Sequence, residues 1–270
     1  MTHSLPLRGR TALVTGASRV RGIGAAVARR LAAMGADVAI HHHRAHDVEQ
    51  PWGADELADV RASIEPHLAP GARLLDLPGD LADPAAPAAL VDAATDALGA
   101  LDILVCNHAI SGTDGTLAEI DAAALDAHWA VDARAVLLLT KAFAARHDPS
   151  RPGGRVIWMT SGQGKGPMRG EIAYATAKAA LAGMTMTVAD ELAPQGILLN
   201  TVNPGPVNTG FLDPGNGMDD ATLEWLRDRF PSGRFGEPDD PARLIAWLVS
   251  DEGEWIVGQV IDSEGGFRRA

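Results

Sequence analysis

One tyrosine and a nearby lysine are the residues of this 270-residue chain whose types and spacing most suggest acid–base chemistry. Tyr174 is the only tyrosine, and Lys178 is one of three lysines among 23 lysines and arginines. Their spacing of four residues places them on the same face of a helix. Moving a phenol pKa from about 10 to about 7 needs roughly 4 kcal/mol, which one ammonium at about 4 Å supplies at an effective dielectric constant of about 20. The pair therefore suits a proton-transferring phenol, although a core tyrosine beside a surface lysine would show the same spacing.

Two further polar side chains follow apolar runs of the sequence. Ser161 comes just after the run at residues 155–159, and Asn107 comes just after the run at residues 101–106. If these runs are parallel strands, both side chains lie at the carboxyl edge of the sheet, where open α/β sheets bind ligands. Helix capping is the alternative explanation for each residue alone. Their convergence with Tyr174 favours a site at this edge.

A glycine-rich segment, residues 15–24, lies between the first apolar run and a helical stretch. Glycines allow a tight turn whose backbone N–H groups approach a pyrophosphate at a helix N-terminus. The spacing differs from the common G-x-G-x-x-G fingerprint, so a purely structural turn is the alternative. In the dinucleotide interpretation, the cofactor-binding residues of the segment are Gly16, Ser18, Arg19, Gly22, Ile23 and Gly24.

The end of the second apolar run indicates which dinucleotide to expect. An acidic side chain there would bind the ribose hydroxyls of NAD, whereas positive side chains accept the 2′-phosphate of NADP. No Asp or Glu occurs at residues 38–44. The candidate phosphate partners are His42, His43, Arg44, Arg19 and Arg21. The sequence thus predicts NADP(H) in preference to NAD(H), with a solvated strand end as the alternative for the histidines. No metal site is expected there, because adjacent strand residues point to opposite faces.

Short apolar runs alternate with alanine-rich helical stretches along the chain. The expected strands are residues 11–15, 36–40, 73–77, 101–106, 155–159, 197–202 and 259–262. The expected helices are residues 24–34, 84–98, 122–146, 173–192 and 240–250. This alternation predicts an α/β fold, a doubly wound parallel sheet of seven strands with helices on both faces. No internal repeat or linker divides the chain, so residues 1–270 are expected to form one domain.

Two segments interrupt the alternation. Residues 46–55 lengthen the connection after the second strand, and residues 204–238 form a long stretch rich in Gly and Pro. Loops of that length are usually functional lids or disordered, and we expect a substrate lid at about residues 206–238. Its apolar side chains predict an apolar substrate, or else they only pack the lid onto the body. They are Phe211, Leu212, Met218, Leu223, Trp225 and Leu226.

Composition excludes several classes of protein. Hydrophobic residues make up 46% of the chain, which excludes a disordered protein, and the net charge of −12 argues against broad nucleic-acid binding. Cys106 is the only cysteine, so neither an intrachain disulfide nor a cysteine zinc site is expected. The first ten residues lack an apolar signal-peptide core, and no window approaches about eighteen apolar residues. We therefore expect a cytoplasmic protein without a membrane partner.

Together these motifs resemble the short-chain dehydrogenase/reductase family over nearly the whole chain. The resemblance rests on residues 15–24, Asp80-Leu81 after the third strand, Asn107, Ser161 placed thirteen residues before Tyr174-Ala-Thr-Ala-Lys178, and residues 204–209. The likeness is greatest to the 3-oxoacyl-[acyl-carrier-protein] reductase-like branch. It implies a Rossmann fold and an NADPH-dependent reduction of a ketone to a secondary alcohol.

The resemblance also implies a role for each matching residue. Tyr174 would be the general acid, Ser161 would orient the carbonyl oxygen, and Lys178 would hold the nicotinamide ribose and lower the pKa of the tyrosine. Tyr174 and Lys178 would thus both contact the cofactor. The remaining expected cofactor contacts are Asp80, Leu81, Asn107, Ala109, Pro204, Gly205, Val207 and Thr209.

Three departures from the family pattern stand out. The glycine loop carries two extra residues, and His108 occupies a position where the family usually has alanine. Asp132 aligns with the usual relay asparagine, and we include it among the expected catalytic residues. An ionised aspartate can accept a hydrogen bond from a relay water but cannot donate one.

The resemblance extends to partners. The substrate would be a 3-oxoacyl thioester or a small carbonyl compound, and the chain would form a homodimer or homotetramer, with the helices at 122–146 and 173–192 as candidate interface elements. Docking of acyl carrier protein is not expected, because Pro152 and Gln195 stand where carrier-binding reductases present arginines. The exception would be a separate patch of Arg227, Arg229 and Arg234.

Two other functions are weighed against this one. A non-catalytic dinucleotide-binding redox sensor would need the glycine loop but not the set Ser161, Tyr174 and Lys178. A structural scaffold would need neither.

Overall fold

Seven parallel strands form one sheet in the order β3-β2-β1-β4-β5-β6-β7. The structure is a computed structural model that describes residues 5–151, 153–216 and 218–268. The strands are β1 (Thr11–Val14), β2 (Asp37–His42), β3 (Leu74–Pro78), β4 (Ile103–Cys106), β5 (Arg155–Met159), β6 (Leu198–Asn203) and β7 (Val260–Asp262). The strand order reverses between β1 and β4, and ligands bind at the carboxyl ends of the strands at such a reversal. The expected fold class is therefore confirmed.

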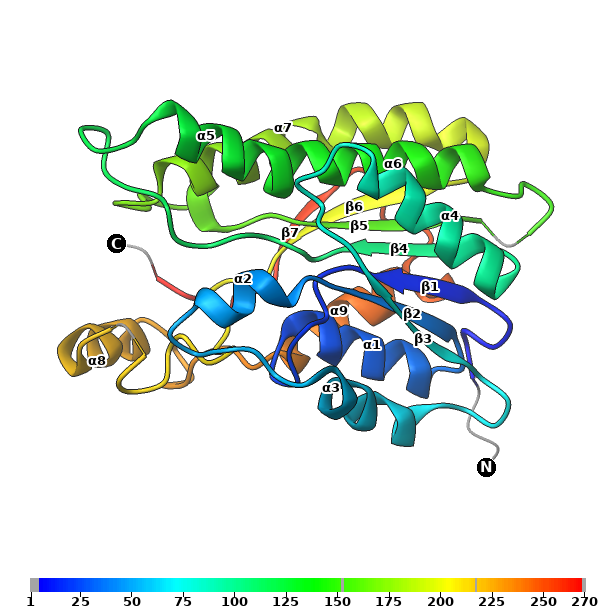
Figure 1. Cartoon of the computed structure of the whole chain (residues 1–270), viewed down its shortest axis with the longest axis horizontal. Coiled ribbons are helices and arrows are strands. Elements are labelled where there is room, and N and C mark those ends of the chain that lie inside the picture. Colours follow the sequence, from blue (N-terminus) through cyan, green and yellow to red (C-terminus); the bar gives the residue numbers. More distant parts are fainter. Residues whose placement is uncertain (1–4, 152, 217, 269–270) are drawn as a thin grey trace.

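Helices cover both faces of the sheet (Figure 1). One layer contains α4 (Ala86–Leu98), α5 (Ala122–His128), α6 (Ala135–Arg146) and α7 (Ile172–Leu192). The other contains α1 (Ile23–Ala33), α3 (Leu57–Ile64) and α9 (Asp239–Leu248). Within the described residues, no helix is both long and apolar enough to cross a membrane.

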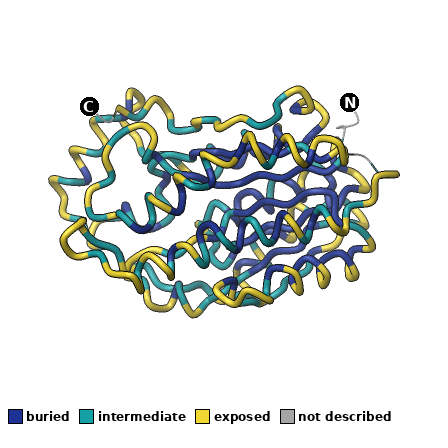
Figure 2. The backbone as a smooth tube through the Cα atoms, turned by 90° about the horizontal axis from the view of Figure 1, so that it is seen from above, coloured by how far each residue is buried: buried dark blue, intermediate teal, exposed yellow. Residues whose placement is uncertain are grey.

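The core follows from the alternation of side chains along each strand. Val14 and Val38 belong to the apolar cluster under α1 and α9, whereas Leu13 and Ala39 belong to the cluster under α4, α6 and α7. Figure 2 shows the strands as the buried centre of the molecule and the connecting loops as its exposed rim. Both faces of the sheet are thus covered, which leaves the carboxyl edge as the accessible place for a site.

Three α-helices of the structure are not predicted from the sequence: α2 (Arg44–Glu49), α3, and α8 (Asp220–Asp228). Each has six to nine residues, and so few turns give a weak periodic signal. α2 and α8 both flank the open carboxyl end of the sheet (Figure 1). The segments expected as an extended connection and a lid are therefore partly helical.

The helix expected at residues 122–146 is broken in its middle. Residues Trp129–Arg134 form a π-helical segment between α5 and α6. Such wide turns are rare and occur frequently at functional sites. Here the segment buries the polar side chain of Asp132, and His128 precedes it.

Candidate active site

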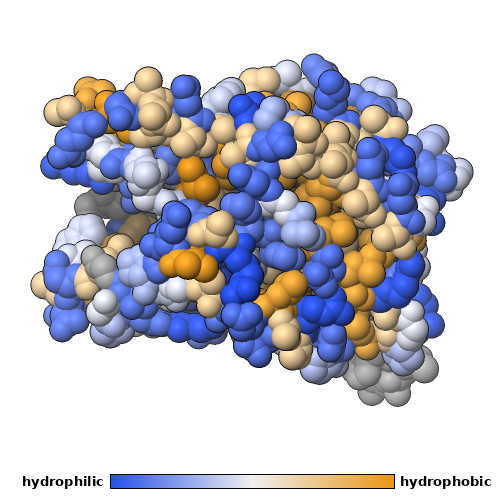
Figure 3. Space-filling view, viewed as in Figure 1, coloured by the Kyte–Doolittle hydropathy of each residue, from blue (hydrophilic) through white to orange (hydrophobic). Residues whose placement is uncertain are grey.

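A cleft with a volume of about 1480 Å³ opens at the carboxyl edge of the sheet. In the space-filling view the molecule is hollowed at its left end, between the part that holds α5 and the part that holds α8 (Figure 3). Most of the expected site residues line the cleft. They are Gly16, Ser18, Arg19, Gly22, Ile23, His43, Asp80, Leu81, Asn107, Ala109, Ser161, Tyr174, Pro204, Gly205, Val207 and Thr209. Four expected residues lie outside this lining: Gly24, His42, Asp132 and Lys178.

The glycine loop has the shape of an anion cradle. Gly16 has φ +67°, and a Cβ atom there would lie 2.6 Å from the Cα of His108, so glycine is required. The Asn107 side chain donates to the carbonyls of Thr15 (3.1 Å) and Gly16 (3.0 Å), which fixes the loop against β4. A Cβ atom at Gly24 would lie 2.6 Å from the Gly16 oxygen. Gly24 therefore allows α1 to pack close to the loop. It does not line the cleft, where a contact with the cofactor was expected.

The glycine loop packs against the lengthened connection after β2. Asp47 of α2 accepts a hydrogen bond from the Ser18 hydroxyl and lies 3.6 Å from the Arg19 Nε atom. The Arg19 guanidinium lies 5.7 Å from the ring centroid of Trp52. These contacts hold Arg19 in the wall of the cleft. They also bring the carboxylate of Asp47 close to the end of β2, although residues 38–44 themselves contain no acidic side chain.

The histidine run divides between the two faces of the sheet. His42 lies outside the cleft lining with its Nε2 atom 3.8 Å from Asp76, so the structure does not support the expected phosphate contact by His42. β2 extends two residues beyond the predicted end, and alternation turns His42 away from its neighbours. His43 lines the cleft as expected, and so does His41, whose Nδ1 atom accepts from the backbone N–H of Gly16 (3.3 Å). Burial lowers the pKa of His41 to about 4, so this ring is neutral at pH 7.

Two other cationic candidates lie outside the cleft lining. Arg21 pairs with Asp213 (2.6 Å), and Arg44 pairs with Glu56 (2.7 Å). Arg19 and His43 are therefore the candidates that remain for a 2′-phosphate.

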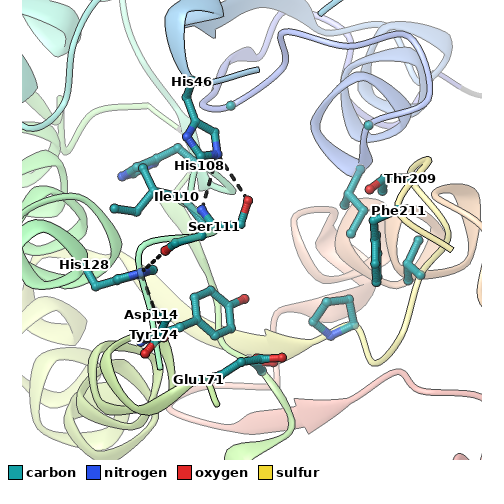
Figure 4. Close-up of a pocket in the computed structure, with 18 of the residues that line it drawn as sticks. His46, His108, Ile110, Ser111, Asp114, His128, Glu171, Tyr174, Thr209 and Phe211 are labelled. Atoms are coloured by element: carbon teal, nitrogen blue, oxygen red, sulfur yellow. Dashed lines mark hydrogen bonds and ion pairs between the residues drawn. The ribbon is translucent and has the colours of Figure 1, made fainter. Parts of the chain in front are cut away.

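Tyr174 lies on the opposite wall of the cleft from Phe211, with its hydroxyl directed into the space between them (Figure 4). Ser161, which follows β5, lines the same space. Lys178 lies one turn further along α7 and is buried. Its Nζ atom donates to the Met159 carbonyl (3.2 Å) and lies 5.6 Å from the centroid of the Tyr174 ring. The structure thus brings the phenol and serine together at the cleft and places the ammonium behind them.

The phenol of Tyr174 is held in its protonated form. Burial raises its pKa above the ordinary value, the carboxylates of Asp132 and Glu171 act in the same direction, and a hydrogen bond with Ser161 opposes them. The net direction is opposite to that expected from Lys178 alone. Burial also lowers the pKa of Lys178, although Asp132 opposes this shift. A protonated phenol is the form that can donate a proton to a substrate oxygen.

The segment expected as a lid forms part of the cleft wall. Five of its six apolar candidates line the cleft: Phe211, Leu212, Met218, Trp225 and Leu226. Leu223 is buried outside the lining. The lid also meets the connection after β2, because the rings of Phe211 and Trp52 lie 6.1 Å apart in an edge-to-face arrangement.

Comparison with known proteins places this architecture in a family. A family model described as "Enoyl-(Acyl carrier protein) reductase" matches residues 16–268. A solved short-chain dehydrogenase from Burkholderia cenocepacia, in complex with NADP, is 37% identical and superposes with a TM-score of 0.82 over 97% of this chain and 98% of that chain. The chain belongs to the short-chain dehydrogenase/reductase family.

Curated relatives agree over the full length. An uncharacterized oxidoreductase of Bacillus subtilis, YjdA, is 41% identical over 270 residues, which is 100% of both chains. A cyclohexanol dehydrogenase of a Rhodococcus species is 34% identical and covers 98% of each chain. The protein is therefore an oxidoreductase of the dehydrogenase type.

One functional residue of this short-chain dehydrogenase/reductase was not found from the sequence. The Asp114 carboxylate accepts hydrogen bonds from the backbone N–H groups of Ala173 (2.9 Å), Tyr174 (2.9 Å) and Gly115 (2.8 Å). Burial opposes its ionisation, but these three donors hold the pKa of Asp114 below its usual value. Asp114 thus caps the start of α7 from a different segment, so no local spacing in the sequence reveals it.

Substitution of Asp114 tests this positioning role. Asp114→Ala is expected to lower the free energy of unfolding by about 1–2 kcal/mol, because the N–H groups of α7 lose their acceptor. It is also expected to lower kcat, because the backbone that carries Tyr174 is no longer fixed. Urea unfolding and initial rates measure the two effects.

Asp121→Ala is the matched control, because Asp121 caps α5 by accepting from Ala124 N (2.9 Å) away from the cleft. It should lose similar stability but keep kcat. Equal kcat values for the two variants would show that Asp114 does not position Tyr174.

Asp132, in place of the usual asparagine, is fully buried and does not reach the cleft. Its Oδ1 atom accepts from Ile110 N (2.8 Å), and its Oδ2 atom lies 2.8 Å from His128 Nδ1. Both oxygens are therefore occupied by protein groups. The expected catalytic role of Asp132 is thereby corrected to one that acts through its neighbours.

The loop that Asp132 supports is strained. Thr113 has φ +46°, a left-handed conformation that is unusual for a β-branched residue and costs about 1–3 kcal/mol. The preceding Gly112 directs its carbonyl to His128 Nε2 (3.0 Å), and Asp114 follows. Hydrogen bonds on both sides thus hold the loop against α7.

Proposed function

We propose that this protein uses NADPH to reduce a ketone to a secondary alcohol, with Tyr174 as the general acid. The observation that carries the proposal is that a protonated phenol is directed into the same cleft as the glycine loop. Bound NADPH would supply the hydride to the carbonyl carbon. The chain itself supplies binding, orientation and the proton.

Each residue of the catalytic set has a part in that reaction. Ser161 donates its hydroxyl proton in a hydrogen bond to the substrate carbonyl oxygen and orients it beside the phenol. Tyr174 then donates its proton to the same oxygen as negative charge develops there. The buried ammonium of Lys178 limits the cost of the phenolate that remains.

The residues present fit a dinucleotide. Gly16, Ser18 and Gly22 of the glycine loop line the cleft, and the N-terminus of α1 follows the loop directly at Ile23. Arg19 of the glycine loop and His43 at the end of β2 both line the cleft and are the residues that would contact a 2′-phosphate. The Burkholderia structure contains NADP, which supports the same cofactor here.

For the substrate we propose a 3-oxoacyl thioester or a small carbonyl compound, as in the 3-oxoacyl-[acyl-carrier-protein] reductase-like branch. The apolar lid supports an apolar ketone, and the Rhodococcus relative is named for a secondary alcohol. Docking of the carrier itself is not part of the proposal. Arg234 is already paired with Asp240 (2.7 Å), and Pro152 lies outside the described residues.

Cofactor preference can be measured with purified protein. NADPH is expected to bind about tenfold more tightly than NADH in fluorescence titrations, because Arg19 and His43 are available to the 2′-phosphate. Arg19→Gln is expected to remove most of this ratio by weakening NADPH alone. The quantity compared is the ratio of the two dissociation constants, for NADH and NADPH. Loss of the Arg19–Asp47 contact could weaken the binding of both cofactors, and such a common effect cancels in the ratio.

Arg21→Gln is the control, since Arg21 carries the same charge on the same loop but lies outside the cleft lining. Equal affinities of the wild-type protein for the two cofactors would refute the assignment of NADP(H).

A further inference from the structure

His128, at the end of α5, has an acceptor at each of its ring nitrogens. Nδ1 lies 2.8 Å from Asp132 Oδ2, and Nε2 lies 3.0 Å from the Gly112 carbonyl oxygen. Nε2 is also 4.0 Å from Asp114 Oδ2. The imidazole is fully buried beside the cleft (Figure 4).

This geometry defines the protons on the ring. A carbonyl oxygen only accepts, so Nε2 carries a proton. An ionised carboxylate also only accepts, so Nδ1 carries a second one. The other oxygen of Asp132 accepts a backbone N–H from Ile110 (2.8 Å). With Asp132 as a carboxylate, this geometry corresponds to a buried imidazolium–carboxylate pair.

We propose that His128 is an imidazolium positioning residue, which neutralises Asp132 and fastens residues 110–114 beside the catalytic Tyr174. The loop is held at three points: Ile110 N on Asp132, the Gly112 carbonyl on His128, and Asp114 on the start of α7. These loop residues form one wall of the substrate cleft. The charge on His128 thus fixes the wall against which a substrate would lie.

Charged groups from several elements surround the His128 ring. Asp132 lies in the π-helical segment, Asp114 lies in the loop after β4, and Glu171 precedes α7. The ring of Tyr174 lies edge-to-face at 6.0 Å between centroids. Lys178 is a further cation that interacts with Asp132. Asp132 acts to raise the pKa of Tyr174. In the proposal, a positive His128 beside Asp132 offsets that effect.

The protonation of His128 agrees with its surroundings. Burial disfavours the imidazolium, but the hydrogen bonds to Asp132 and Gly112 and the charges of Asp132 and Asp114 raise the pKa of His128 above its ordinary value. The raised pKa favours the charged ring, which loses its proton as the pH rises through that pKa. Above it, Asp132 faces Tyr174 without this compensation.

An asparagine at position 132 would keep the geometry without the charges. Its oxygen could accept from Ile110 N, and its amide could donate to a neutral His128 at Nδ1. Asp132→Asn therefore removes the charge from both partners and keeps both hydrogen bonds. Replacing His128 alone has a different effect, because His128→Gln leaves the buried carboxylate of Asp132 without its imidazolium partner.

Nitrogen NMR of the full chain with ¹⁵N-labelled histidine tests the protonation state without any assay of activity. In the wild type at pH 7, the signals absent from His128→Gln should show both ring nitrogens protonated. In Asp132→Asn, the same ring should have one bare nitrogen, Nδ1. If His128→Gln does not fold, the comparison of wild type with Asp132→Asn assigns the His128 signals instead. A neutral His128 in the wild type, or a charged one in Asp132→Asn, would overturn the proposal.

A double-mutant cycle tests the consequence for catalysis, which rests on the proposed function. His128→Gln should shift the pH profile of alcohol oxidation upward by about one unit, so that the rate on its rising limb falls about tenfold. In the Asp132→Asn background, the same substitution should change that rate by less than about twofold. An equal loss in both backgrounds would indicate a purely structural histidine and contradict the proposal. If the wild type oxidises no alcohol, the proposed function fails, while the NMR result still decides the charge.

Discussion

Replacing Tyr174 with phenylalanine is expected to lower kcat by several orders of magnitude and to leave the affinity for NADPH nearly unchanged. The substitution removes one hydroxyl, and a positioned general acid contributes about 10²–10⁴-fold to a rate. Loss of the hydrogen bond to the developing oxyanion adds to this effect. The ring itself remains, with its edge-to-face contact to His128, so the fold of α7 is preserved. Steady-state rates and cofactor fluorescence titrations measure the two quantities.

The control for this variant lies on the same helix. Thr176→Ala also deletes one hydroxyl, but from an exposed position where Oγ donates to the Ile172 carbonyl (2.7 Å). It should keep both kcat and cofactor affinity. A Tyr174→Phe enzyme that still turned over at the wild-type rate would remove the phenol from the mechanism.

Replacing Lys178 with methionine is expected to lower kcat by about 10²-fold or more, since the charge that stabilises the phenolate is lost. Methionine has a similar length and no charge, so it can occupy the buried position of Lys178. Burial of an ammonium is costly, and its removal is expected to preserve or raise the free energy of unfolding. The variant would thus keep or gain stability while it loses activity, which urea unfolding and initial rates can show together.

Lys141→Met provides the matched control, because Lys141 is an exposed lysine on α6. It should change neither kcat nor the free energy of unfolding by much. If Lys178→Met kept its kcat, the ammonium would have no catalytic part, and the spacing of Tyr174 and Lys178 would reflect packing alone.

The sequence was most informative where the chemistry is local. The alternation of apolar runs and helical stretches predicted the seven-stranded sheet, because buried parallel strands are apolar throughout. Because Asn107 and Ser161 each follow a predicted strand, the sequence also placed both at the carboxyl edge of the sheet. The short spacing between Tyr174 and Lys178 reflected a real helix face, as the 5.6 Å between ring and ammonium shows. Glycines marked the cradle because positive φ at Gly16 excludes other residues.

The sequence was least informative where partners are distant. Asp114 caps α7 across about sixty positions, and the charge state of His128 depends on three segments at once. The π-helical segment leaves the apolar pattern of its helix intact, so the sequence pattern does not predict it. β2 runs two residues longer than predicted, so His42 is still part of the strand. Side chains alternate along a strand, and the His42 side chain therefore lies on the side of Asp76, outside the cleft lining.

The most direct test of the account combines wild-type protein, NADPH deuterated at the transferable position, and a panel of small ketones and 3-oxoacyl thioesters. We expect the loss of NADPH absorbance to match formation of a secondary alcohol one to one, with deuterium on the carbinol carbon. A protein that bound NADPH tightly yet transferred deuterium to no member of the panel would contradict the account and favour a dinucleotide-binding sensor.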